Sequence, residues 1–120
     1  MLVRGIRGAI TIDDDVPNKV LAATQELLKT IQAANGFKID DIASILFTVT
    51  QDVRSAFPAE AARLIGWDRV PLLCFQEIEV QGALPRCIRV LIHINTDKPQ
   101  GQIKHIYLRE AKVLRRDLLS

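Results

Sequence analysis

The sequence predicts an α+β protein built on a five-stranded, mixed but mainly antiparallel sheet, with one long helix and one short helix. The first observation behind this is a strand-like alternation of apolar residues, which recurs in segments from the beginning to the end of the chain. The second is that the last fifty residues hold three such segments without a long helix between them. That order favours antiparallel pairing over a doubly wound nucleotide-binding sheet.

The first half of the chain predicts one strand and the long helix. Alternation in 2–12 indicates a strand, in which Arg7 shares its face with small residues. Pro17 suits the first turn of an amphipathic helix of about five turns. Asn35 and Gly36 are typical of a helix end, so the helix should stop there.

The rest of the chain is richer in strands. Residues 42–50 alternate again, and Phe57-Pro58 opens a short alanine-rich helix that should end near Gly66. The last three strands are predicted at 70–80, 87–95 and 103–108.

The composition is that of one folded domain. The chain of 120 residues has no repeat and no break in composition, so we expect a single domain over 1–120. Hydrophobic residues make up 48% and charged residues 25%, which excludes a disordered tail. The net charge is only +2 and the basic residues are scattered, so no nucleic-acid partner is expected.

Neither a membrane segment nor an export signal is predicted. The longest uncharged apolar run, 70–75, is far shorter than the roughly 20 residues of a membrane helix. Arg4 and Arg7 interrupt the N-terminal segment where a signal peptide would be continuously apolar. We therefore expect a cytoplasmic protein, with Cys74 and Cys87 as free thiols.

The predicted helices leave part of the sheet uncovered. One long helix covers one face, but segments 42–50 and 87–95 carry apolar residues on both faces. A symmetric oligomer would cover the second face. Alternatively, the short helix and the C-terminal tail would cover it in a monomer.

The common catalytic motifs are missing from the sequence. His93 and His105 lie in different predicted strands, and the two cysteines lack the spacing of a metal site. The glycines are dispersed, so they form no phosphate-binding loop, and no nucleophilic serine motif appears. Metal hydrolysis, nucleotide chemistry and acyl transfer are disfavoured, and neither a metal nor a cofactor is expected.

Arg89 is the unusual residue, because it interrupts a strand that could otherwise be buried on both faces. Arg7 raises the same question in the first strand. A buried cation needs a partner, and Glu77, Glu79 or an anionic ligand could serve. An Arg–Glu bridge within the sheet and a two-arginine clamp on carboxylates remain open alternatives.

Several short segments resemble, in order and with matching gaps, the small monofunctional chorismate mutases of the trimeric, non-helical class. The likeness runs from the first strand nearly to the C-terminus. Its segments are Arg4-Gly-Ile-Arg-Gly-Ala9, Ala56-Phe-Pro-Ala59 with Arg63, Val70-Pro71, Cys74, Gln76-Glu77, Cys87-Ile-Arg-Val90, Asn95-Thr-Asp97, His105-Ile-Tyr-Leu108 and Val113-Leu-Arg115.

The resemblance implies a fold and a function. Such enzymes convert chorismate to prephenate on the route to phenylalanine and tyrosine, by a concerted rearrangement that needs no cofactor. Their homotrimers form a pseudo-α/β-barrel with active sites between subunits. The implied partners are therefore the small-molecule substrate and two further copies of the chain.

The resemblance also implies which residues act. The implied catalytic residues are Arg89 at the ether oxygen, Arg7 and Tyr107 at the side-chain carboxylate, and Glu77 at the ring hydroxyl. The implied substrate-binding residues are Phe57, Ala59, Arg63, Leu72, Leu73, Cys74, Leu114 and Arg115. Glu60 departs from the pattern, since some members have lysine there.

Two other readings compete with this one. Reactive-intermediate deaminases and other small-carboxylate-binding trimers have a similar barrel shape, but they use one anchoring arginine rather than this set. An RNA-binding domain would need exposed strand aromatics, and the chain has only four Phe, one Tyr and one Trp.

Overall fold

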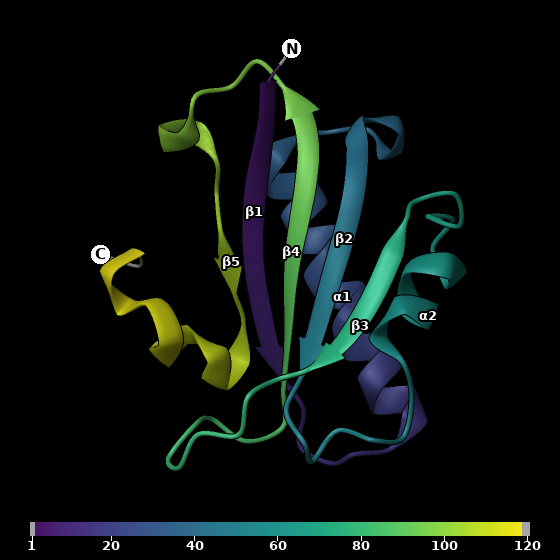
Figure 1. The fold of residues 1–120 in the computed structure, drawn as a ribbon, viewed down its shortest axis with the longest axis vertical. Coiled ribbons are helices and arrows are strands. Elements are labelled where there is room, and N and C mark those ends of the chain that lie inside the picture. The colour runs from purple at the N-terminus through teal and green to yellow at the C-terminus, as the bar shows by residue number, and fades with distance from the viewer. Residues whose placement is uncertain (1, 119–120) are drawn as a thin grey trace.

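The computed structural model describes the backbone of residues 2–118 and the side chains of residues 2–114. Five strands form one mixed sheet, with the long helix packed behind it (Figure 1), so the predicted fold class is confirmed. The elements are β1 (Leu2–Thr11), α1 (Pro17–Asn35), β2 (Ile42–Val49), α2 (Pro58–Leu64), β3 (Leu72–Gln76), β4 (Cys87–Thr96) and β5 (Ile106–Tyr107). Short 3-10 helices occupy Ile39–Asp41, Gln100–Gln102 and Arg109–Leu118.

The sheet has the strand order β3-β2-β4-β1-β5. Its long central pairings, β1 with β4 and β2 with β4, are antiparallel, as predicted. The two edge pairings, β2 with β3 and β1 with β5, are parallel. At the β3 edge the reason is the connection: α2 lies between β2 and β3, and a crossover of this kind returns the chain in the same direction.

The long helix α1 has the predicted limits. Pro17 stands at its first turn, where the missing amide hydrogen costs nothing. Gly36 ends the helix in the left-handed conformation, with φ of 69°, and its amide donates to the carbonyl of Gln32. The side chains of Val20, Leu27 and Ile31 are fully buried against the sheet.

Two strands are shorter than predicted. The third ends at Gln76, because β2 finishes at its partner Val49 and the chain then turns away. Residues 77–86 form a loop in which Ile78 is 87% exposed. The fifth strand contains only Ile106 and Tyr107.

The two faces of the sheet differ in cover. One face buries Ile6, Phe47, Ile88 and Ile92 against α1, while α2 packs on α1 and β3. Over the opposite face, no α-helix of the described chain lies across the strands (Figure 1). The Arg109–Leu118 segment packs mainly on β1 and β5 at one edge of the sheet, and its Ala111 is buried in one cluster with Cys87 at the start of β4. Within residues 2–118, no helix is long and apolar enough to cross a membrane.

Candidate active site

Arg89 projects from the uncovered face of the sheet. Its Cα partners are Ala9 on β1 and Thr48 on β2, so it lies on the middle strand between two small or short side chains. The side chain is 42% exposed, and its Nε is buried without a hydrogen-bond acceptor among the described residues. The short neighbours therefore leave open space beside the guanidinium.

Glu77 is the charged partner of Arg89. Its Oε2 lies 3.3 Å from Arg89 Nε, and the same oxygen accepts a hydrogen bond of 3.0 Å from Thr48 Oγ1. The Glu77 side chain is only 17% exposed, and its amide donates to the carbonyl of Val49 at 2.9 Å. The loop thus holds Glu77 against the end of β2.

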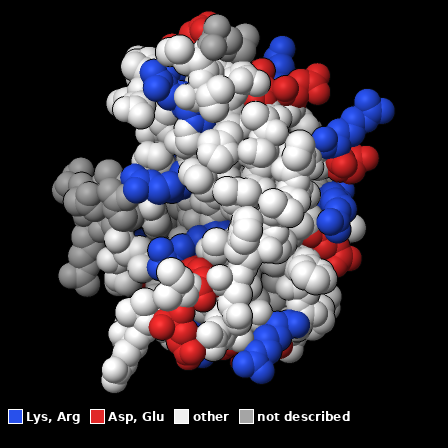
Figure 2. Space-filling model, viewed as in Figure 1, with Lys and Arg blue, Asp and Glu red and all other residues white. Residues whose placement is uncertain are grey.

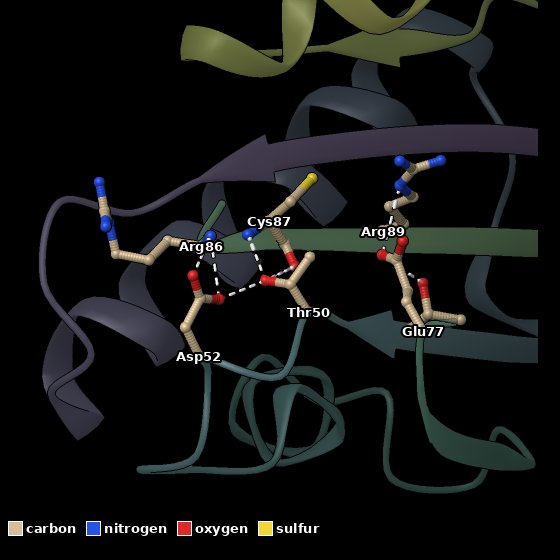
Figure 3. Close-up of polar contacts among 7 residues, drawn as sticks. Thr50, Asp52, Glu77, Arg86, Cys87 and Arg89 are labelled. Atoms are coloured by element: carbon tan, nitrogen blue, oxygen red, sulfur yellow. Dashed lines mark hydrogen bonds and ion pairs between the residues drawn. The ribbon is translucent and has the colours of Figure 1, made fainter. Parts of the chain in front are cut away.

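The terminal nitrogens of Arg89 remain directed away from Glu77 (Figure 3). The ion pair uses the Nε side of the guanidinium, and the forked end points across the sheet toward β1. The Arg–Glu bridge that the sequence left open is present, and the fork remains available for an anion.

Arg7 and Tyr107 share a hollow with Arg89. The hollow has a volume of about 240 Å³ and is lined by Arg7, Gly8, Arg89, Val90, Tyr107 and Leu114. Arg7 is exposed on β1, and its amide donates to His105 Nδ1 at 2.9 Å. Tyr107 is buried on β5, where it pairs with Ala9. The residues predicted as catalytic on three strands, together with Leu114, therefore converge on one hollow.

A second hollow of about 290 Å³ adjoins the first on the same face, and Arg7 and Arg89 line both. Its other lining residues include Leu46, Thr48 and Phe75. In the space-filling view, basic groups lie on the left and lower sides of the depression in the middle of this face, with acidic groups below them (Figure 2). This part of the surface combines apolar walls with fixed positive charge.

The other predicted binding residues lie elsewhere on the chain. Phe57, 71% exposed, and Cys74 line a separate hollow of about 570 Å³. Arg63 and Leu73 are exposed and Leu72 is half-buried. Ala59 is only 3% exposed and packs in the core. Within one chain, Phe57 and Cys74 are therefore not brought into the hollow of Arg89.

One predicted residue cannot be placed. The side chain of Arg115 lies outside the described residues.

Cys87 adds an uncharged neighbour to Arg89. Burial raises the pKa of the Cys87 thiol to about 11, against the opposing effect of the Arg89 charge. The thiol therefore stays protonated at neutral pH and leaves the positive charge of Arg89 uncompensated on that side. Cys87 and Cys74 are both free, as predicted.

The start of β4 is fixed by polar contacts that the sequence did not indicate. Both carboxylate oxygens of Asp52 accept from the amide of Arg86 at 3.0 Å (Figure 3). Thr50 Oγ1 accepts from the amide of Cys87 at 2.9 Å. Arg86 has a positive φ of 47°, a strained conformation that these bonds help to maintain. They anchor β4 two residues before Arg89.

The geometry suits recognition of a small anion. Guanidinium groups bind carboxylates through paired hydrogen bonds, and a phenol hydroxyl can donate one more. Among the described residues, no group of three or more His, Cys, Asp or Glu side chains could hold a metal ion.

Comparison with known proteins gives a consistent result. The model of the family "Chorismate mutase type I" matches residues 3–118. A chorismate mutase AroH from Thermus thermophilus is 56% identical over 120 residues, which is 99% of this chain and 98% of that protein. One from Bacillus subtilis (strain 168) is 45% identical over 119 residues, covering 98% and 94%.

A solved structure extends the likeness to three dimensions. The chorismate mutase from Clostridium thermocellum superposes with a TM-score of 0.90 at 52% identity, over 92% of this chain and 98% of that one. Sequence and fold therefore agree over nearly the whole length, and the chain belongs to the type I chorismate mutase family.

Proposed function

We propose that this chain converts chorismate to prephenate at sites formed between the subunits of a homotrimer, with Arg89 as the principal catalytic residue. In the reaction the ether carbon–oxygen bond breaks while a carbon–carbon bond forms, and no proton is transferred. Family membership supports the activity. One observation supports the location of the site: the guanidinium of the half-exposed Arg89 side chain shares a hollow with Arg7 and Tyr107.

The substrate explains the positive charge of the hollow. Chorismate has two carboxylates, and Arg7 and Tyr107 are suited to bind the one on the side chain. Binding it there would hold the flexible ether in the compact shape that reacts. Such positioning can supply several kcal/mol of the barrier, on the order of 7–11 in favourable cases.

Arg89 stabilises the negative charge that develops in the transition state. The ether oxygen becomes partly negative as its bond stretches, and a cation already in place stabilises this charge without reorganisation. Glu77 accepts a hydrogen bond from the ring hydroxyl in this proposal and also restrains Arg89. It does not act as a general base, because no proton is removed.

The trimer is proposed from the bare face of the sheet. Leu73 and Phe75, which are 59% and 46% exposed, lie on strand β3 at its edge. A neighbouring copy would cover this apolar surface and bring its own Phe57 and Arg63 to the hollow of Arg89.

A cytoplasmic location belongs to the same proposal and rests on the sequence.

The decisive experiment follows chorismate absorbance on mixing with purified protein, for the wild type and for Arg89→citrulline made by semisynthesis. Citrulline keeps the shape and removes the charge. We expect the wild type to consume chorismate and the variant to lose at least about a hundredfold in kcat, since one preorganised donor is worth about 10²–10³.

Arg69→Ala is the matched control. Arg69 is exposed and outside the hollows that contain Arg89, so its loss should leave kcat unchanged. Inert wild-type protein would refute the proposed activity, and an active citrulline variant would refute the role of Arg89. The deaminase alternative is not favoured, because the matching family and relatives are chorismate mutases.

A further inference from the structure

Thr48 is placed to control the contact between Arg89 and Glu77. It lies on β2 and is the Cα partner of Arg89 on β4 and of Phe75 on β3, so it shares their face of the sheet. Its hydroxyl donates to Glu77 Oε2 at 3.0 Å. The same oxygen lies 3.3 Å from Arg89 Nε. One carboxylate oxygen is therefore held by a hydroxyl on one strand and by a cation on the next.

This arrangement is not the strongest one available to the two charges. A carboxylate and a guanidinium normally favour two parallel hydrogen bonds. Here Arg89 Nε is buried and has no hydrogen-bond acceptor among the described residues, although Glu77 lies beside it. Glu77 is only 17% exposed, so little water competes for its oxygens. Something other than attraction to Arg89 must therefore determine where the carboxylate lies.

The hydroxyl of Thr48 is that restraint. The backbone amide of Glu77 donates a hydrogen bond of 2.9 Å to the carbonyl of Val49. This bond holds the backbone, so only the side chain of Glu77 is free to rotate. The Thr48 hydrogen bond then fixes the carboxylate near Nε. The terminal nitrogens of Arg89 point away from Glu77 (Figure 3).

We propose that Thr48 is a positioning residue, whose hydroxyl keeps Glu77 on the Nε side of Arg89 and so leaves the forked end free for the anionic substrate. This inference rests on the proposed function. Without the hydroxyl, Glu77 rotates onto the terminal nitrogens and competes with the substrate carboxylate and ether oxygen for them.

The first test compares Thr48→Val with Thr48→Ser. Valine keeps the shape and removes the donor, whereas serine keeps the donor and removes a methyl group. We expect Thr48→Val to raise KM about tenfold with a smaller fall in kcat, and Thr48→Ser to stay within about threefold of wild type. Equal KM values for Thr48→Val and wild type would overturn the proposal, as would equal damage from both variants.

Ser44→Ala is the control. Ser44 lies on the same strand and face, and its hydroxyl interacts with His93 Nδ1 at 3.0 Å rather than with the charged pair. Its removal should leave kcat and KM unchanged. A loss of the same size in Ser44→Ala would show that any hydroxyl on this strand matters, and would overturn the specific role of Thr48.

The second test asks whether Thr48 acts through Glu77. In a Glu77→Gln background no carboxylate competes for Arg89, so adding Thr48→Val should change kcat/KM less than about twofold. An unchanged tenfold effect in that background would overturn the proposal.

A crystal structure of Thr48→Val provides a readout that does not depend on turnover. We expect a Glu77 carboxylate oxygen within hydrogen-bond distance of an Arg89 terminal nitrogen. A carboxylate that remains at Nε overturns the inference. If wild-type protein leaves chorismate unchanged, the proposed function fails, and this crystallographic result still decides the structural claim.

Discussion

At the scale of single residues, Arg89 is stable within β4 because its charge is only partly removed from water. Nε is buried beside Glu77, while 42% of the side chain remains exposed. A fully buried cation without a partner would cost several kcal/mol. The guanidinium thus has Glu77 on its Nε side, while its terminal nitrogens are free to bind a second anion. A site for a dianion needs such free nitrogens.

Cys87 provides a prediction about pH. The thiol ordinarily loses its proton near pH 9.0, but in the folded chain it does so only near 11 because it is buried. Between these values the unfolded state binds fewer protons than the folded state, so the free energy of unfolding falls as pH rises. The loss should reach about 3 kcal/mol.

Urea unfolding at fixed protein concentration, at intervals from pH 8 to pH 11, would measure this effect. Cys87→Ala should lose less stability over that range than the wild type, because its side chain does not ionise. The comparison concerns the slope with pH, since the alanine variant also leaves a cavity at every pH. Identical slopes would show that Cys87 is not the group responsible.

Sequence reasoning singled out Arg89 and Glu77 but not Thr48, which contacts Glu77. Arg89 was recognisable because a charge in an apolar strand requires an explanation, and Glu77 was one of the candidate partners that this explanation offered. Thr48 was not recognisable, since threonine is common in strands for its shape alone. Its role depends on the register that pairs it with Arg89, and alternation gives the face of a strand but not its register.

At the scale of elements, β1 and α1 pack closely at Gly8. A Cβ there would lie 2.6 Å from Ile31 Cδ1 and 3.2 Å from Leu27 Cδ1. We predict that Gly8→Ala lowers the free energy of unfolding by about 1–2 kcal/mol, since overfilling a packed core is destabilising. Because Arg7 precedes Gly8 on β1, kcat/KM should also fall.

Gly101→Ala is the matched substitution for thermal and urea unfolding. A Cβ at Gly101 would meet nothing within 4 Å, and this glycine is not among those with positive φ. Its stability should therefore match that of the wild type. Equal stability of the Gly8→Ala variant would mean that α1 can move away from the sheet at little cost.

The elements differ in how far local sequence determines them. Pro17 and Gly36 mark the ends of α1 by their own backbone chemistry, so both ends were predictable. The end of β3 was not, because the apolar residues Ile78 and Val80 continue the strand pattern beyond it. Only the loss of the partner strand after Val49 ends the pairing.

At the scale of the whole molecule, the separate hollows of one chain give a test of the proposed trimer. In the proposed trimer, each active site combines the hollow of Arg89 from one subunit with the hollow of Phe57 from its neighbour. Arg89→Ala damages the first hollow and Phe57→Asp the second, so each variant alone should be inactive. In a trimer that contains both variants, one interface in three joins an intact Arg89 hollow to an intact Phe57 hollow. Random assembly from equal amounts should therefore restore about a quarter of the wild-type activity.

Co-expression of the two chains with different tags, followed by purification and assay, would measure the recovery. The matched pair is Arg89→Ala with Arg7→Ala, since both residues line the same hollow. Every site in that mixture carries one defect, so activity should not return. Recovery of activity in the matched pair would contradict a site shared in this way. So would a lack of recovery when Arg89→Ala is combined with Phe57→Asp.

The bare face of the sheet also has a consequence for a single copy of the chain, before the proposed trimer forms. A newly folded copy presents Leu73 and Phe75 to every other unfinished protein around it, and exposed apolar patches promote unwanted association. In the proposed trimer this exposure lasts only until the copies of the chain meet. Synthesis of many copies from one messenger, close together in space, would shorten that interval.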